Sequence, residues 1–237
     1  MLASDARVIM ISGANRGIGR AVAEVLYGEG YRLSLGTRKV QELNRELAHW
    51  DAARVLVHPF DATDPTAPNS WVATTVARFG RLDGLVNNAG IARHAGLEDE
   101  DETALDELWT VNVKGPLRLT RAALPHLRRS GSGRIVNVSS LSGKRVKNDN
   151  VGYAMSKFAL LALTHATRRA GWDDGIRCTA LCPSFVATDL TREITKVSRE
   201  EMIQPADLAR LVATVMALPN TATVAELLVN CRLEDML

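Results

Sequence analysis

Apolar runs of strand length alternate with longer amphipathic segments along almost the whole chain of 237 residues. The strand-length runs lie at 8–11, 32–35, 54–57, 82–86, 134–138, 177–181 and 224–229. The segments with helical periodicity lie at 18–27, 40–49, 69–79, 102–127, 153–169 and 205–218. Strands that alternate with helices are typical of a parallel sheet with helices on both faces. The pattern therefore predicts a doubly wound α/β fold with about seven parallel strands.

The alternation continues without a linker, an internal repeat or a shift in composition. We therefore expect one domain over residues 1–237. Turn-forming residues support the helix limits, since Gly28-Glu29-Gly30 ends the first helix and Asp64-Pro65 starts the third. In such a sheet, ligands bind at the carboxyl ends of the strands. The connection 189–204 at that edge is the expected substrate lid.

Charge and composition argue against several other classes of protein. With 29 basic and 27 acidic residues the net charge is +2, which is too small for a dedicated nucleic-acid-binding domain. We interpret the short basic runs 128–129 and 144–147 as solvated clusters. The histidines are scattered and the three cysteines lack metal-ligand spacing, so no metal is expected and the cysteines are interpreted as buried free thiols. Because no signal peptide or run of about 18 apolar residues is present, we expect a cytoplasmic protein that does not bind membranes.

A glycine-rich turn directly follows the first expected strand, in the sequence Ser12-Gly13-Ala14-Asn15-Arg16-Gly17-Ile18-Gly19. Gly13 permits a sharp turn, Gly17 lets the backbone approach a pyrophosphate, and Gly19 allows close packing of helix on strand. The helix that follows offers N–H groups and the positive end of its dipole. The turn is therefore a candidate dinucleotide site, with a purely structural turn as the alternative.

The end of the second expected strand indicates which nucleotide binds. Sites for NAD place an Asp or Glu about 20 residues after the glycine turn, where it accepts hydrogen bonds from the ribose 2′-OH. This chain has Leu35-Gly36-Thr37-Arg38-Lys39 there, with no carboxylate. Arg38, and Arg16 within the turn, are permanently charged donors for a 2′-phosphate. We therefore expect NADP(H), with two solvated arginines at helix starts as the alternative.

Tyr153 and Lys157 are four residues apart on an expected helix, which places both side chains on one face. Hydride transfer to a carbonyl develops negative charge on its oxygen, so a reductase needs an acid there. A tyrosine has an ordinary pKa of about 10, and an adjacent ammonium would lower that pKa. Of the three tyrosines, only Tyr153 has this spacing to a lysine. The pair is a candidate acid with its activating cation, and a simple surface pair is the alternative.

Five motifs taken together resemble the short-chain dehydrogenase/reductase family: the 13–19 turn, Asn87-Asn88-Ala89-Gly90, Asn112, Ser140 and Tyr153-Ala154-Met155-Ser156-Lys157. The resemblance extends from about the first strand to the region of Thr188. It implies a Rossmann-type oxidoreductase that acts on a carbonyl or alcohol. In the implied reaction, NADPH delivers hydride to a carbonyl carbon while Tyr153 donates a proton to the oxygen, and oxidation is the reverse.

The resemblance also implies roles for the other catalytic positions. Ser140 lies thirteen residues before Tyr153, a spacing that selects it over Ser139, and it would hydrogen-bond the substrate oxygen. Lys157 would lower the pKa of Tyr153 and bond the nicotinamide ribose. Asn112 would hold a water that links Lys157 to bulk solvent.

Further positions match the family's cofactor-binding residues. Asp61 would contact the adenine, with an Asx turn or a helix cap as the alternative. Residues 88–90 would form a bed for the adenosine ribose, and Ser184 stands where the family usually has glycine. Three residues after the sixth strand would contact the nicotinamide carboxamide: Pro183, Val186 and Thr188. The full set of expected cofactor-binding residues is Gly13, Asn15, Arg16, Gly17, Ile18, Gly19, Thr37, Arg38, Asp61, Ala62, Asn88, Ala89, Gly90, Tyr153, Lys157, Pro183, Val186 and Thr188.

Charged connections at the same edge bear on the substrate. The 189–204 segment is short and polar, and the loop 141–150 contains Lys144, Arg145 and Lys147. A polar or anionic substrate is the resulting hypothesis.

The helices at 102–127 and 153–169 resemble those that pair across the family's dimer interface, so we expect a homodimer or homotetramer. Segment 224–237 lacks the glycine pair that ends many family tetramers. One alternative function is a β-ketoacyl thioester reductase, although the ordinary C-terminus of that group is missing. The other is a non-catalytic NADP(H)-binding sensor, whose signature would be loss of Ser140, Tyr153 or Lys157, and none of these is lost.

Overall fold

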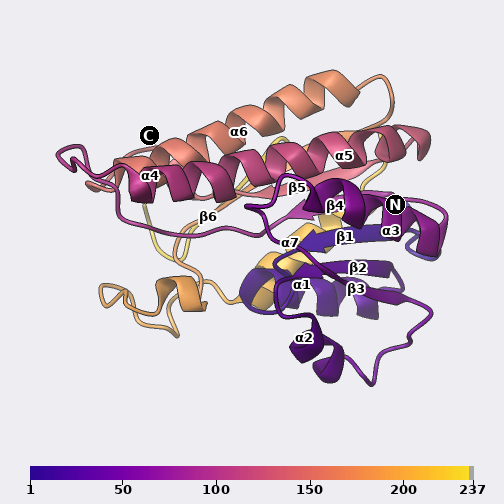
Figure 1. Ribbon diagram of the computed structural model, residues 1–237. Helices are drawn as coiled ribbons and strands as arrows, with labels where there is room; N and C mark the ends of the chain where they lie inside the picture. Colours follow the sequence, from indigo (N-terminus) through magenta and orange to yellow (C-terminus); the bar gives the residue numbers. More distant parts are fainter. Residues whose placement is uncertain (235–237) are drawn as a thin grey trace.

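A computed structural model describes residues 1–234 and contains one sheet of seven parallel strands, in the order β3-β2-β1-β4-β5-β6-β7 (Figure 1). The strands are β1 (Val8–Ser12), β2 (Arg32–Thr37), β3 (Val55–Pro59), β4 (Gly84–Asn87), β5 (Arg134–Val138), β6 (Arg177–Pro183) and β7 (Glu226–Val229). The predicted doubly wound fold is confirmed. Of the domain expected over 1–237, residues 235–237 lie outside the described residues.

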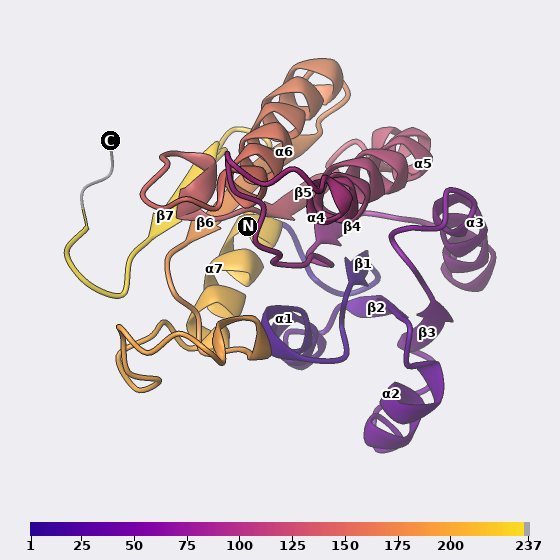
Figure 2. The same cartoon turned by 60° about the vertical axis from the view of Figure 1, so that its left-hand side comes forward.

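Helices cover both faces of the sheet (Figure 2). They are α1 (Gly17–Gly28), α2 (Val40–Glu46), α3 (Ala67–Phe79), α4 (Thr103–Leu108), α5 (Gly115–Arg129), α6 (Val151–Gly171) and α7 (Pro205–Ala217). One face carries α1 and α7, which pack against each other, and the other carries α3, α5 and α6. No helix among residues 1–234 is both long and apolar enough to cross a membrane.

The central strand β1 is buried over its whole length because both of its faces are covered. Ile9 and Ile11 contribute to the core beneath α1 and α7. Val8 and Met10 point the opposite way, into the core beneath α3 and α5. A strand that alternates between two apolar layers has a continuous apolar sequence, which explains why residues 8–11 of β1 are all apolar.

The helix expected over 102–127 is not one regular helix. After α4 the backbone widens into a π-helical segment, η1 (Trp109–Lys114), before α5 begins at Gly115. The third helix begins at Ala67, after the expected start signal Asp64-Pro65 and before the periodic segment 69–79. Asp64 accepts hydrogen bonds from the N–H and hydroxyl of Thr66, so it forms a turn before α3 rather than the helix start.

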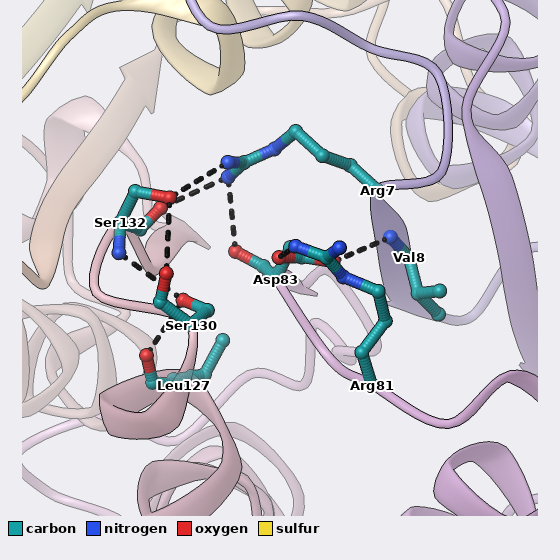
Figure 3. Close-up of polar contacts among 7 residues, drawn as sticks. All are labelled: Arg7, Val8, Arg81, Asp83, Leu127, Ser130 and Ser132. Carbon is teal, nitrogen blue, oxygen red and sulfur yellow. Dashed lines mark hydrogen bonds and ion pairs between the residues drawn. The ribbon is translucent and has the colours of Figure 1, made fainter.

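Polar residues at the amino ends of the strands tie the sheet to its turns (Figure 3). Asp83 is fully buried and accepts hydrogen bonds from Val8 N at 2.9 Å and from the Arg81 guanidinium at 2.7 and 2.8 Å. Arg7 donates to the hydroxyl and carbonyl oxygens of Ser132, both at 2.9 Å. This edge is thereby closed by internal contacts, and the opposite, carboxyl edge is the one that carries the candidate site.

Candidate active site

The glycine-rich turn connects β1 to α1 and is held against the end of β2. Gly13 and Gly17 have φ of +67° and +56°, values that favour glycine. The N–H groups of Gly13 and Ala14 donate to Gly36 O at 2.9 and 3.2 Å. A Cβ at Gly19 would lie 2.4 Å from Gly13 O, so a side chain there would separate the helix from the turn.

The first turn of α1 fits an anionic group such as a pyrophosphate. Arg16, the residue before the helix, makes no side-chain capping bond, and the first turn contains no acidic residue. The N–H groups at a helix start need an acceptor and carry the positive end of the dipole. Of the other turn residues predicted to bind the cofactor, Asn15 is partly exposed and Ile18 packs against the core.

The end of β4 is bound to the glycine turn by hydrogen bonds. Asn88 donates through Nδ2 to Ser12 O at 2.9 Å and Gly13 O at 3.1 Å, and Ala89 N donates to the Ser12 hydroxyl at 3.0 Å. Asn87 points inward, where Nδ2 donates to side chains of α5 and β5. Residues 88 and 89 therefore lie beside the glycine-rich turn, whereas Asn87 has a structural role.

The two arginines expected to bind a 2′-phosphate have different surroundings. Arg38 is exposed directly after the buried Thr37, and within residues 1–234 it has no ion-pair partner. Arg16 instead pairs with Asp189 at 2.8 Å, and Asp189 also binds Arg192 at 2.7 Å. Arg16 thus connects the glycine turn to the 189–204 segment. Arg38, at the end of β2, has no ion-pair partner among residues 1–234 and is available to a ligand.

Asp61 forms the Asx turn that was its structural alternative. Its Oδ1 accepts hydrogen bonds from the N–H and hydroxyl of Thr63, at 2.9 and 2.8 Å. Ala62 is buried next to the start of α5. A Cβ added at Gly115, the first residue of α5, would lie 3.0 Å from the Cβ of Ala62. This turn orders the chain after β3 at the carboxyl edge.

Ser140, Tyr153 and Lys157 meet where β5 ends and α6 begins. The Lys157 ammonium donates to Val138 O at 3.1 Å and lies 5.6 Å from the centre of the Tyr153 ring. The Ser140 side chain interacts with the phenol and accepts from Ser142 N at 3.1 Å. Ser139 has another task, since its buried hydroxyl donates to Lys157 O at 3.1 Å. The two serines therefore have different contacts, and of the two only Ser140 is seen to interact with the Tyr153 phenol in the described chain.

Burial controls the charge states of the pair. It raises the pKa of Tyr153 to about 12, and the interaction with Ser140 opposes this rise. Burial also lowers the pKa of Lys157 to about 8. The sequence predicted a lowered pKa for Tyr153. That prediction is wrong for the protein's own residues, because desolvation dominates the Tyr153 pKa and the Lys157 ammonium, which donates to Val138 O, is not among the groups that shift it.

Asn112 lies in the π-helical segment and is buried. Its Oδ1 accepts from Ile91 N at 2.9 Å, and its Nδ2 donates to Ile91 O at 3.0 Å and to the Ser156 hydroxyl at 3.1 Å. A Cβ at Gly90 would lie 3.2 Å from Asn112 Oδ1 and 3.9 Å from Lys157 Nζ. Asn112 and Lys157 therefore converge on the backbone at Gly90.

The segment after β6 forms the remaining side of the candidate site. Ser184, at the position where glycine was expected, has ordinary backbone geometry, because Ala6 is the only non-glycine residue with positive φ among residues 1–234. Val186 is buried and pairs with Ile203, and Arg199 donates to Thr188 O. These contacts hold the two ends of the 189–204 segment close together. In Figure 2 this segment is the orange loop beside α1.

Two contacts at this site were not predicted from the sequence. Ser156 donates to Tyr153 O at 2.8 Å and accepts from Asn112 Nδ2, so it joins η1 to the start of α6. Its place inside the Tyr153–Lys157 motif was the available signal. The pairing of Arg16 with Asp189 had no sequence signal, because it depends on how the 189–204 segment folds.

A model of the short chain dehydrogenase family matches residues 7–199. The chain belongs to this family. It has the Rossmann-type α/β fold of this family.

Individual relatives agree with this assignment. An agropine synthesis reductase of Rhizobium rhizogenes is 45% identical over 231 residues, which are 97% of this chain and 53% of the relative. The chain therefore spans about half the length of that protein. An uncharacterized oxidoreductase of Staphylococcus saprophyticus is 31% identical and is matched over 94% of this chain and 95% of its own length.

Solved structures of family members bind either nicotinamide dinucleotide. An alcohol dehydrogenase from Thermococcus sibiricus complexed with 5-hydroxy-NADP is 30% identical, with a TM-score of 0.85 and coverage of 94% of this chain and 95% of that one. A 3-ketoacyl-(acyl-carrier-protein) reductase from Brucella melitensis complexed with NADH is 26% identical, with a TM-score of 0.87 and coverage of 96% and 98%. Family membership alone thus leaves open the choice between NAD and NADP.

Proposed function

We propose that this chain is an NADP(H)-dependent reductase that interconverts a carbonyl compound and its alcohol, with Tyr153 as the acid or base. The observation that carries the proposal is the convergence of Ser140, Tyr153 and Lys157 at the end of β5. The uncapped start of α1 at the same edge supports a bound dinucleotide. We also propose that residues 1–237 act as one domain, since both ligands would bind along a single sheet edge.

The preference for NADP(H) rests on Arg38. The chain has no carboxylate at the end of β2 to bind a ribose 2′-OH. Arg38 is exposed and free of ion pairs within the described chain, so its guanidinium is available for a 2′-phosphate. Arg16 would contribute only by exchanging its contact with Asp189.

The remaining cofactor contacts are proposed from position. The glycine turn and residues 88–90 would hold the pyrophosphate and the adenosine ribose, and Asp61 with Ala62 would border the adenine. Pro183, Val186 and Thr188 would bind the nicotinamide end. When bound, the nicotinamide supplies a hydride in reduction and accepts one in oxidation.

The side chains account for the proton. With its pKa raised to about 12, Tyr153 keeps its proton at neutral pH and can donate it from Oη to the substrate oxygen. Ser140 Oγ would donate a second hydrogen bond to that oxygen and fix its orientation. A protonated phenol is the form that reduction requires, and oxidation would use the phenolate as the base.

Lys157 and Asn112 complete the proton path. Because the pKa of Lys157 is lowered to about 8, it is mostly an ammonium at pH 7. One of its protons is donated to Val138 O, and the others are available to the ribose and to the phenol. The Asn112 side chain is occupied by Ile91 and Ser156, so Asn112 would hold a relay water through its backbone.

We further propose that the protein assembles as a homodimer or homotetramer through the helices of residues 102–127 and α6. Trp109, Met155 and Phe158 expose large apolar side chains on η1 and α6, and these two elements pack against each other. Exposed apolar groups on neighbouring elements are typical of an interface.

The test is NADPH consumption across aldehydes, ketones, quinones and keto-thioesters, with Tyr153→Phe as the control. We expect turnover of at least one carbonyl class, and a loss of at least 100-fold in the variant. NADPH affinity, measured by fluorescence titration, should change little. Substantial activity in Tyr153→Phe would refute the role of Tyr153. If the unmutated protein binds NADPH but reduces none of these compounds, the non-catalytic sensor is favoured.

A further inference from the structure

A largely buried ion pair joins the loop after β5 to the segment after β7. The Arg145 guanidinium donates through Nη2 to Glu234, and their side chains are only 10% and 12% exposed. The same carboxylate accepts a hydrogen bond from the hydroxyl of Ser184. Glu234 is thus held between two loops that are far apart in the sequence.

These two loops flank the proposed reaction site. Strands β5 and β6 are neighbours, with Val138 aligned to Leu181, so the chains that follow them leave the same edge together. Arg145 lies five residues after Ser140 on one loop, and Ser184 directly follows Pro183 on the other. Arg145 N donates to Leu141 O at 3.2 Å, which fixes the loop that carries it.

One donor of the Arg145 guanidinium is unused by the described part of the chain. Its Nη1 is buried and has no hydrogen-bond partner among residues 1–234. A buried donor without a partner lowers the stability of the folded protein. Guanidinium groups satisfy two donors at once when they bind a carboxylate through both oxygens. Glu234 divides its oxygens between Arg145 and Ser184, so it leaves this second bond unmade.

The neighbouring lysine lacks this property. Lys144 pairs with Glu226 at 2.8 Å, and Glu226 also binds His165 at 2.8 Å. Its charge is therefore balanced by a carboxylate on β7. Of these two adjacent basic residues in the 141–150 loop, Arg145 is the one with a buried and unused donor.

We propose that Arg145 binds a carboxylate of the substrate, and that Glu234 is a built-in counter-ion which this carboxylate displaces. The substrate class is then an oxo acid, with a carboxylate and a separate carbonyl group. The substrate carboxylate would take two parallel hydrogen bonds from Nη1 and Nη2 of Arg145. Before binding, Glu234 keeps the buried guanidinium neutralised. The inference rests on the proposed function, since it needs a substrate carbonyl at Tyr153.

The test compares three oxo acids with their primary amides: 4-oxopentanoate, 5-oxohexanoate and 6-oxoheptanoate. The chain length varies and only the charge differs within each pair. We expect the unmutated protein to favour at least one acid in kcat/KM with NADPH. In Arg145→Met the ratio of acid to amide should fall at least 20-fold. In Arg210→Met, which removes an exposed arginine paired with Asp207, the ratio should stay within threefold.

Glu234→Gln gives the opposite expectation and leaves Arg145 intact. Removal of the competing charge should raise the affinity for the best oxo acid at least threefold, measured by calorimetric titration. Unchanged or weaker binding in this variant overturns the proposal, even where Arg145→Met fails to fold. Inorganic phosphate is titrated as well, and tighter Arg145-dependent binding of phosphate than of any oxo acid also overturns it.

The calorimetric readout separates this inference from the proposed function. If oxo acids bind in an Arg145-dependent manner but no compound is reduced, the proposed function fails and the carboxylate site stands. If ketones and amides are reduced as well as the acids, and Arg145→Met leaves the acid-to-amide ratio unchanged, the proposed function stands and the carboxylate site is refuted.

Discussion

Lys157 is a buried cation whose position has a cost in stability. The ammonium donates to one carbonyl, Val138 O, and no carboxylate is among the groups that shift its pKa. Its pKa falls from 10.5 in a solvated lysine to about 8. A difference of this size corresponds to roughly 3 kcal/mol of unfavourable free energy at neutral pH. Functional sites commonly contain residues that lower stability in this way.

We therefore expect Lys157→Met to be inactive but more stable than the unmutated protein. The loss of one hydrogen bond subtracts about 1 kcal/mol, so the free energy of unfolding should rise by about 1–2 kcal/mol at pH 7. Urea denaturation measures it. Lys39→Met, at an exposed lysine paired with Glu42, is the control and should change stability by less than about 0.5 kcal/mol.

The pH dependence of this difference has a definite sign. The unfolded chain binds the lysine proton more tightly than the folded protein, so between pH 8 and 10.5 the unmutated protein gains stability relative to the variant as pH rises. The advantage of Lys157→Met should be complete below pH 8 and absent above pH 10.5. A constant difference across this window would show that Lys157 is not desolvated.

Arg38 is the residue on which the nucleotide preference depends. In Arg38→Asp the new carboxylate would accept hydrogen bonds from a ribose 2′-OH and repel a 2′-phosphate. We expect the ratio of kcat/KM for NADPH over NADH to fall by about 100-fold, or roughly 3 kcal/mol. Lys39→Asp, which changes the charge of the adjacent residue equally, should shift the ratio by less than tenfold. A preference for NADH in the unmutated protein would refute the assignment.

Individual residues were predictable where a local pattern reports chemistry. The spacing of Tyr153 and Lys157 and the strand end at Ser140 lead to the same place in the structure. The partner of Arg16 was not predictable, because Asp189 is 173 residues away and carries no motif for this contact. The shift in the Tyr153 pKa also depends on packing, which the spacing to Lys157 does not describe.

At the scale of the elements, the π-helical segment η1 places the Asn112 side chain where it can bind the backbone of the segment after β4. The amide of Asn112 forms paired hydrogen bonds with the N–H and C=O of Ile91, as a neighbouring strand would. Ile91 directly follows Gly90, so the chain after β4 is fixed beside Lys157. Departures from the α-helix are frequent at functional sites because they redirect a side chain.

Asn112→Leu should therefore destabilise the protein and loosen the chain at Ile91. Both backbone groups of a partly buried residue lose their partner, so we expect the free energy of unfolding to fall by about 1–3 kcal/mol. Hydrogen exchange of the Ile91 amide should become faster. Asn69→Leu, at an exposed position of α3, is the control and should change stability by less than about 0.5 kcal/mol. An unchanged exchange rate at Ile91 would contradict this role.

The elements were predictable in number and order because apolar periodicity reports which faces are buried. Each expected strand corresponds to a strand of the sheet, and the alternation specifies the parallel arrangement. The division of 102–127 into α4, η1 and α5 was not predictable. The periodicity is compatible with one helix, and the π-helical segment makes its contact with Ile91, which lies outside that stretch.

At the scale of the molecule, the two edges of the sheet serve different purposes. At the amino edge, buried arginines bind carbonyl oxygens, as Arg134 does with Leu218 O at the end of α7 and with Gly175 O after α6. Cations are favourable at helix carboxyl ends. Burial, with the charges of Arg7 and Arg177, lowers the pKa of Arg134 to about 10. This edge is closed by contacts within the chain, and the carboxyl edge carries the glycine turn, the proposed catalytic residues and Arg145.

The face formed by η1 and α6 gives the last prediction, which concerns assembly. Met155 and Phe158 are three residues apart, so they project from the same side of α6, and they are 46% and 41% exposed. A charge at the centre of an apolar interface is buried without a partner and prevents association. Phe158→Glu should therefore halve the mass measured by sedimentation equilibrium. Leu190→Glu, at an exposed leucine of the segment between β6 and α7, should leave the mass unchanged.

Because the fold of α6 does not depend on an exposed side chain, the Phe158→Glu protein should keep its helical circular dichroism. A variant that keeps both its helicity and the mass of the unmutated protein would show that α6 does not form the interface.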